Sequence, residues 1–210
     1  MNIQDLFNLD KKIAFISGGA TGIGRMAAEA MAMAGARVLI ASRKGSLCAS
    51  VAEELNQKGY KGTVEGFEGD LSSEAGVEAV VKEIQIRTGQ LNILMNNAGR
   101  SWGAPLGSFP HNAWEKVMSL NVAGLFSLTQ SLIPLLEKSA THEDPARVIN
   151  VGSVMGEIPM GDGAYSYSAS KAAVHQITKV LVINFPPYIG GYEVFGFYWF
   201  KIRYVLNEGM

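Results

Sequence analysis

A glycine-rich segment joins a short apolar run to an amphipathic helical segment near the start of this chain. Residues 12–17 (KIAFIS) are mostly apolar, and residues 17–24 (SGGATGIG) follow at once. Glycine has no Cβ, so the backbone can turn sharply there and approach a ligand closely. The helix that begins near Gly22 would direct free N–H groups and its positive dipole end toward an anion. This order of strand, glycine loop and helix predicts a dinucleotide-binding unit, although a plain turn can use the same residues.

Apolar runs and helical segments then alternate along most of the chain. We expect strands near residues 12–17, 37–41, 63–67, 91–95 and 147–151, and helices near residues 22–34, 46–58, 72–87, 112–138 and 167–183. Strands that alternate with helices of this length indicate parallel βαβ units, in which buried strands are continuously apolar. The sequence therefore predicts an α/β fold, a doubly wound parallel sheet of the Rossmann type with helices on both faces.

Composition and charge exclude several other classes of protein. The formal net charge is −1, so the chain lacks the basic character of nucleic-acid-binding proteins. One cysteine, Cys48, and three scattered histidines cannot form a disulfide or a Cys/His metal cluster, so we expect no metal. The first residues, with Asp5 and Asp10, do not resemble a signal peptide. No segment looks long and apolar enough to cross a membrane, and we expect a cytoplasmic protein.

The residues after the second predicted strand bear on the choice of cofactor. NAD-binding sites usually have an acid roughly 20 residues after the glycines, which holds the ribose 2′-hydroxyl. Here Ser42, Arg43 and Lys44 stand at that point. An acid would repel a 2′-phosphate, whereas arginine can bind it with two hydrogen bonds. The sequence therefore predicts NADP(H) rather than NAD(H); the alternative is that the two cations merely begin an exposed turn.

Two further loops follow predicted strands and would border the cofactor. Asp70 can accept a hydrogen bond from the adenine amino group, and the small residues around Ala98 let the chain pass beside a flat ring; either loop could alone be a turn. The residues that we expect to bind the cofactor are Ser17, Gly18, Ala20, Thr21, Gly22, Ile23, Gly24, Ser42, Arg43, Lys44, Asp70, Leu71, Asn97, Ala98, Gly99, Tyr167 and Lys171.

Four residues are candidates for the reaction itself. Tyr167 and Lys171 lie four residues apart and so share one face of a helix. A nearby ammonium stabilises a phenolate, which makes such a pair a tunable general acid/base. Ser153 follows the fifth strand, where ligands bind in open α/β sheets, and its hydroxyl can donate to a carbonyl oxygen. Asn121 stands inside a predicted helix although Asn is an indifferent helix former, and it could hold a water linked to Lys171.

In order and spacing, SGGATGIG, NNAG at 96–99, Asn121, Ser153 and YSASK at 167–171 resemble the short-chain dehydrogenase/reductase family over residues 10 to about 183. The resemblance implies that Tyr167 protonates a carbonyl oxygen while the nicotinamide delivers hydride to carbon. It also implies that Lys171 holds the nicotinamide ribose and assists Tyr167, that Ser153 orients the carbonyl, and that Asn121 anchors a water of the proton relay.

Three other stretches, RSWGAPL, WEKVMSLNV and DPARVINVGSVMG, resemble 3-oxoacyl-[acyl-carrier-protein] reductases of the rhamnolipid-biosynthesis type. This resemblance implies reduction of a 3-oxoacyl thioester, which could be linked to an acyl carrier protein; another small ketone is the alternative. Trp102, Met155, Ile158 and Met160 would suit an apolar acyl chain, although they are also ordinary core or loop residues.

The sequence changes character after about Val182. We expect a Rossmann-type domain over residues 1–184 and an atypical aromatic-rich tail over residues 185–210, with the last strands of the sheet missing or replaced. The fifth strand could then lack a neighbour, and residues 194–202 (VFGFYWFKI) would be an aggregation hazard. The alternative is that this segment replaces the missing edge strand and covers the fifth strand. The resemblance also implies a homo-oligomer, and this end would remove much of the family's subunit interface. The alternatives are therefore an inactive product and a binding scaffold.

Overall fold

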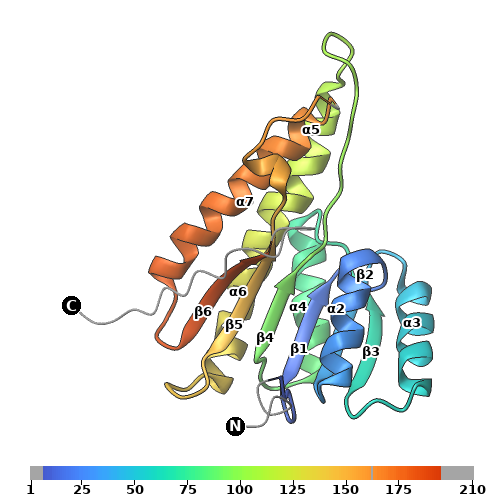
Figure 1. The fold of residues 1–210 in the computed structure, drawn as a ribbon, viewed down its shortest axis with the longest axis vertical. Coiled ribbons are helices and arrows are strands. Elements are labelled where there is room, and N and C mark those ends of the chain that lie inside the picture. Colours follow the sequence, from blue (N-terminus) through green and yellow to red (C-terminus); the bar gives the residue numbers. More distant parts are fainter. Residues whose placement is uncertain (1–6, 162, 195–210) are drawn as a thin grey trace.

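The computed structural model describes residues 7–161 and 163–194. Its six strands form one sheet in the order β3-β2-β1-β4-β5-β6 (Figure 1), and every neighbouring pair is parallel. The strands are β1 (Ile13–Ser17), β2 (Arg37–Ser42), β3 (Thr63–Glu68), β4 (Ile93–Asn96), β5 (Ala146–Val151) and β6 (Ile189–Val194). The strand order reverses between β1 and β4, which confirms the predicted doubly wound α/β fold and places the ligand-binding crevice at the carboxyl ends of these two strands.

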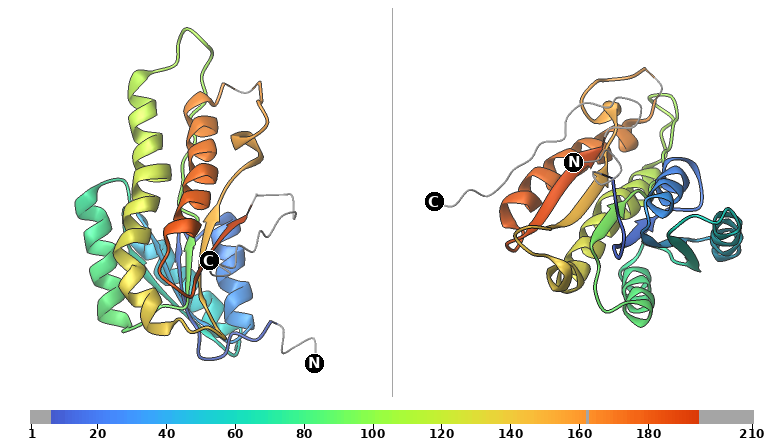
Figure 2. Two further views of the ribbon diagram at one scale, coloured as in Figure 1. Left: turned by 90° about the vertical axis from the view of Figure 1, so that its left-hand side faces the viewer. Right: turned by 60° about the horizontal axis from the view of Figure 1, so that its bottom comes forward.

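Helices cover both faces of the sheet because the strand residues alternate between two apolar clusters. Ala14 and Ile16 of β1 pack in a cluster with α2 (Gly22–Met33) and α3 (Gly45–Gln57). Phe15, between them, packs in a second cluster with the remaining long helices. Those helices are α4 (Glu74–Arg87), α6 (Leu125–Ser139) and the end of α7 (Tyr165–Asn184). Figure 2 shows α2 on the opposite side of the sheet from α4 and α6.

The long helical run between β4 and β5 is interrupted at its centre. It consists of α5 (His111–Met118), a π-helical turn η1 (Ser119–Gly124) and α6. Gly124 permits a close approach there, because a Cβ would lie 2.1 Å from the carbonyl oxygen of Leu71. The run contains 29 residues and is long and apolar enough to cross a membrane, so our expectation that no segment reached that length was wrong. Half of its most apolar window is buried inside the protein.

The chain after residue 184 does not leave β5 without a neighbour, which corrects our expectation. Residues Ile189–Val194 form β6 and pair with β5 over its whole length. The two glycines of the segment IGGYEV weaken its strand signal in the sequence. Gly191 has a packing reason, because a Cβ there would lie 2.4 Å from Cγ2 of Val182. The rest of the predicted aromatic tail, residues 195–210, lies outside the described residues.

Candidate active site

The glycine loop between β1 and α2 forms an open cradle. Gly18 has a φ of +66° and donates its N–H to the carbonyl of Ala41 at 2.7 Å, which fixes the turn out of β1. A Cβ at Gly24 would lie 2.4 Å from the carbonyl oxygen of Gly18, so the helix and the loop touch there. Gly22 faces open space instead. Thr21 makes no side-chain cap bond and the first turn of α2 carries no acid, so the N–H groups of the helix N-terminus are suited to bind an anion.

Ser17 and Asn97 bind the loops after β1 and β4 together at the switch point of the sheet. The hydroxyl of Ser17 accepts from the N–H groups of Asn97 (3.1 Å) and Ala98 (3.0 Å). The side-chain amide of Asn97 donates to the carbonyls of Ser17 and Gly18, both at 3.0 Å. The amide of Asn97 therefore holds the glycine loop in shape, and direct contact between its side chain and a cofactor stays a prediction.

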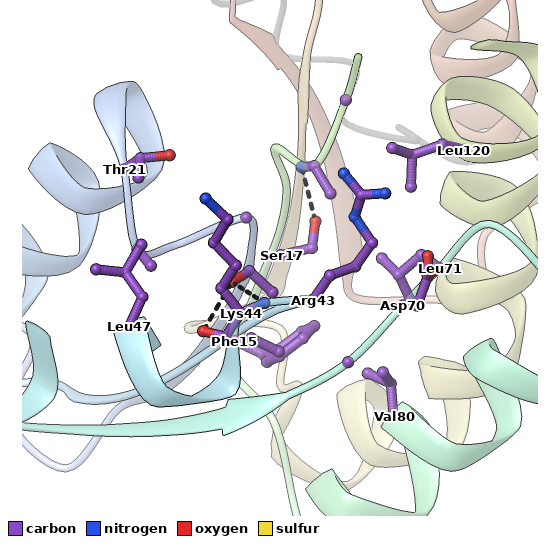
Figure 3. Close-up of a pocket in the computed structure, with 17 residues that line it drawn as sticks. Phe15, Ser17, Thr21, Arg43, Lys44, Leu47, Asp70, Leu71, Val80 and Leu120 are labelled. Carbon is purple, nitrogen blue, oxygen red and sulfur yellow. Dashed lines mark hydrogen bonds between the residues drawn. The ribbon is translucent and has the colours of Figure 1, made fainter. Parts of the chain in front are cut away.

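A cavity of about 250 Å³ opens beside this cradle (Figure 3). The predicted cofactor residues that line it are Ser17, Gly18, Ala20, Thr21, Ser42, Arg43, Lys44, Asp70, Leu71, Ala98 and Gly99. Its remaining walls, which sequence reasoning missed, are Phe15, Ala41, Leu47, Gly69, Val80 and Leu120. These residues are apolar or small, so in the sequence they are indistinguishable from core positions. Gly22, Ile23, Gly24, Asn97, Tyr167 and Lys171 were also predicted to bind the cofactor but do not line this cavity.

Cations dominate the charge of the cavity wall. The side chains of Arg43 and Lys44 diverge from the turn after β2, with Arg43 on the side of Asp70 (Figure 3). Burial raises the pKa of Asp70, but hydrogen bonds from Ser72 and the charges of Arg43 and Arg100 outweigh it, so the pKa lies below its usual value. Asp70 is therefore ionised at neutral pH. Among the described residues that line the cavity it is the one acid, and Arg43 and Lys44 line the same cavity.

Ser42 shapes the turn that carries both cations. Its hydroxyl accepts from the N–H of Lys44 at 3.3 Å and lies 3.1 Å from Sγ of the buried Cys48 in α3. These contacts tie the end of β2 to the first turn of α3. The absence of an acidic side chain at this position, together with Arg43 and Lys44, leaves a site suited to a phosphate group.

Tyr167 and Lys171 share one face of α7, as their spacing predicted. The Nζ atom of Lys171 lies 5.6 Å from the centroid of the Tyr167 ring. It also donates to the carbonyl of Val151 at 2.6 Å, which fixes the buried lysine against the carboxyl end of β5. Tyr167 is half-buried.

Ser153 lies just beyond β5 at the start of a short 3₁₀ turn, η2 (Val154–Gly156). Its hydroxyl accepts from the N–H of Met155 at 3.2 Å. Its own backbone N–H donates to Nε2 of His175 on α7 at 3.3 Å. His175 is 4% exposed and contacts the segment that carries Ser153.

Asn121 lies in the π-helical turn η1, and its side-chain amide is fully engaged. Its Oδ1 accepts from the N–H of Arg100, and its Nδ2 donates to the carbonyl of Arg100, both at 2.9 Å. Nδ2 also lies 3.0 Å from the hydroxyl of Ser170 on α7. π-Helical turns are rare and often occur at functional sites. The amide holds the loop after β4 against α7, and a water bound by Asn121 stays a prediction.

The four predicted catalytic residues therefore meet on α7. Tyr167 and Lys171 belong to it, Ser153 is bonded to it through His175, and Asn121 is bonded to it through Ser170. A phenol, an ammonium and a hydroxyl at the carboxyl edge of a parallel sheet can bind a carbonyl oxygen and transfer a proton to it. Within the described ranges, no group of three or more His, Cys, Asp or Glu side chains could hold a metal ion.

Known proteins resemble this chain over most of its length. The family profile described as short chain dehydrogenase matches residues 12–189. The rhamnolipids biosynthesis 3-oxoacyl-[acyl-carrier-protein] reductase of Pseudomonas aeruginosa is 48% identical over 175 residues, which cover 83% of this chain and 67% of that protein.

Two solved structures are similar as well. The RhlG/NADP active-site complex of Pseudomonas aeruginosa has a TM-score of 0.84 at 45% identity, and the match covers 89% of this chain and 72% of that one. A gluconate 5-dehydrogenase from Burkholderia cenocepacia, in complex with NADP and tartrate, has a TM-score of 0.80 at 29% identity, with 92% and 74% covered. The chain spans about two thirds of the length of the first curated relatives that it matches.

Proposed function

Because the chain belongs to the short-chain dehydrogenase family, we propose that it is an NADPH-dependent oxidoreductase that reduces the carbonyl of a 3-oxoacyl thioester to a secondary alcohol. One observation carries the proposal. Helix α7 brings Tyr167 and Lys171 together and is bonded to the segment that carries Ser153, at the same edge of the sheet as the glycine cradle. A proton donor, a cation and a carbonyl-binding hydroxyl thus lie beside a dinucleotide-binding site.

The residues at the carboxyl edge of the sheet fit NADP(H). The absence of Cβ atoms at Gly18 and Gly24 lets the loop fold tightly at the start of α2, where the N–H groups would bind the pyrophosphate. Arg43 and Lys44 would hold the 2′-phosphate, since no acid stands on that turn to repel it. Asp70 would accept from the adenine amino group. The name of one similar structure, an NADP complex, supports the same choice.

When bound, the nicotinamide would supply a hydride for the carbonyl carbon. The side chains of this protein would perform the remaining steps. Ser153 would donate a hydrogen bond to the carbonyl oxygen and so orient it. Tyr167 would give its phenolic proton to the same oxygen, so that the carbonyl becomes an alcohol. Lys171, fixed by the carbonyl of Val151, would place its positive charge where it stabilises the resulting phenolate.

The loops beside the catalytic residues suit an apolar substrate. The loop after β4 and the loop after η2 are joined by a hydrogen bond from the N–H of Ala104 to the carbonyl of Gly163 at 3.3 Å. Trp102, on the first loop, and Ile158 and Met160, on the second, expose large apolar side chains. An acyl chain could bind these side chains, while coenzyme A or an acyl carrier protein presents the thioester. The name of the 48% identical relative supports this substrate class.

The test uses the purified full chain. NADPH consumption is followed by absorbance with a 3-oxoacyl thioester, with a 3-oxo acid lacking the thioester, and with a sugar ketone. We expect turnover with the thioester and NADPH, and much slower turnover with NADH or with the other carbonyls. Turnover with the sugar ketone alone would contradict the substrate class. Tight NADPH binding without reduction of any carbonyl would instead indicate a binding scaffold.

A further inference from the structure

We infer that His175 is a positioning residue: as a neutral imidazole it accepts the backbone N–H of Ser153 and thereby fixes the Ser153 hydroxyl beside the Tyr167–Lys171 pair. The inference rests on the proposed function, in which Ser153 orients the substrate carbonyl. His175 follows Lys171 by four residues, so it lies one turn further along the same face of α7. The mechanism above gives it no other task.

Contacts from α7 hold the whole segment between β5 and the 3₁₀ turn. Lys171 binds the carbonyl of Val151, and His175 binds the N–H of Ser153. Gly156 packs closely against α7. A Cβ at this position would lie 2.7 Å from Cε1 of His175 and 2.8 Å from the backbone nitrogen of Ala172. The imidazole therefore contacts this segment at two points, the N–H of Ser153 and Gly156. Its position determines where Ser153 lies.

The direction of the hydrogen bond requires a particular form of the imidazole. Nε2 can accept from the Ser153 N–H only when it is unprotonated, which leaves the proton on Nδ1. Nδ1 lies 3.8 Å from Oε1 of the exposed Glu157, a distance too long for a hydrogen bond. In an imidazolium, Nε2 would carry a proton that faces the N–H of Ser153. The repulsion between these two donors would move the turn η2 away from α7.

The surroundings favour the neutral form. Burial lowers the pKa of His175 below its ordinary value, and the charges of Lys179 and Lys171 lower it further, while the carboxylate of Glu157 acts in the opposite direction. These are the charged groups that act on the imidazole from α7 and from the loop after η2 among the described residues. The acceptor form is therefore present at neutral pH and is lost only on acidification.

Two substitutions in the full chain separate positioning from simple packing. His175→Leu fills similar space without an acceptor, whereas the amide oxygen of His175→Gln can reach the position of Nε2. We expect His175→Leu to lower kcat by about 10- to 100-fold, since small displacements of a catalytic group have effects on the order of 10²-fold. His175→Gln should stay within about threefold of the parent and should lose the acid limb of the kcat–pH profile. NADPH affinity should be unchanged in both variants.

A measurement on the unmodified chain needs no activity. Long-range ¹H–¹⁵N correlation spectra of the ¹⁵N-labelled protein report which imidazole nitrogen carries the proton, and the spectrum of His175→Gln identifies the signal. We expect the Nδ1-protonated tautomer, with the amide proton of Ser153 shifting as His175 titrates. The Nε2-protonated tautomer would overturn the inference, and so would equal kcat values for folded His175→Leu and the parent. Absence of turnover in the parent would contradict the proposed function and leave the spectra to decide on His175.

Discussion

The side-chain amide of Asn121 lies 3.0 Å from the hydroxyl of Ser170, so the π-helical turn is bonded directly to the helix that carries Tyr167 and Lys171. The same amide makes two hydrogen bonds with the backbone of Arg100. Asn121 is 2% exposed, and its hydrogen bonds hold three segments together. It connects the loop after β4, the long helical run and α7. These contacts explain why Asn, which has a low helix propensity, occurs inside this helical run.

Replacing Asn121 by alanine should destabilise the fold around the site. The change leaves the partly buried N–H and carbonyl of Arg100 and the buried hydroxyl of Ser170 with fewer partners, and each unsatisfied buried group costs about 1–3 kcal/mol. We expect a loss of that order or more in the free energy of unfolding, measured by urea denaturation. Ser170→Ala removes only one of these contacts and serves as the control. Equal stability of the parent and Asn121→Ala would contradict the structural role of the amide.

A methyl group at Gly24 should damage the nucleotide cradle. A Cβ there would meet the carbonyl oxygen of Gly18 at 2.4 Å and Nδ2 of Asn97 at 2.5 Å, so the loop must move. We expect Gly24→Ala to cost about 1–3 kcal/mol of stability, as overpacking does. NADPH affinity, measured by fluorescence titration, should fall with it. Gly89→Ala is the matched control because no atom lies within 4 Å of its Cβ position. Unchanged affinity in Gly24→Ala would argue against this cradle.

Arg43 should select between the two nicotinamide cofactors. Arg43→Ala removes a charge-assisted partner of the 2′-phosphate, and such a bond contributes enough to change affinity by about tenfold or more. We expect the Kd for NADPH to rise by that factor while the Kd for NADH stays nearly constant. Isothermal titration with both nucleotides measures the two constants on one protein sample. A parallel loss of both affinities would mean that Arg43 supports the turn rather than the phosphate.

His175 should make the stability of the fold sensitive to acid. Its pKa is lower in the folded protein than in the unfolded chain, where it is about 6.5. The unfolded state therefore binds protons first as the pH falls. The contribution of His175 to stability is complete above about pH 6.5 and is lost as the pH falls through the folded pKa. Denaturation at several pH values should show a smaller acid loss for His175→Gln than for the parent. Identical pH profiles would mean that His175 titrates normally in the folded protein.

Most of the architecture follows from local patterns in the sequence. Apolar runs such as RVLIA become inner strands of the sheet because both of their faces are buried. The glycine loop follows β1 and therefore indicates where the strand order of the sheet reverses. The same patterns placed Asp70, Arg43 and Ala98 on loops that the topology brings to one edge of the sheet. They did not show the strand at Ile189–Val194, because two glycines dilute its propensity and its partner β5 lies far away in sequence.

The supporting contacts of the site could not be read from the sequence in the same way. A π-helical turn has the composition of an ordinary helix, so the bonds of Asn121 to Arg100 and Ser170 depend on tertiary packing. His175 could be recognised only by its spacing of four residues from Lys171, a signal that many surface residues share. Leu47, Val80 and Leu120 border the cavity but look like core residues, because an apolar wall and an apolar core have the same composition.

The most direct measurement compares two tyrosines on one helix. Tyr167→Phe removes the proposed proton donor and little volume, whereas Tyr165→Phe makes the same change two residues earlier, where the ring packs against Phe109 at 5.4 Å. With a 3-oxoacyl thioester and saturating NADPH, Tyr167→Phe should lower kcat by about 10²- to 10⁴-fold, the usual contribution of general acid catalysis. Tyr165→Phe should retain the parental kcat, and both should bind NADPH normally. Parental turnover in Tyr167→Phe would contradict the account.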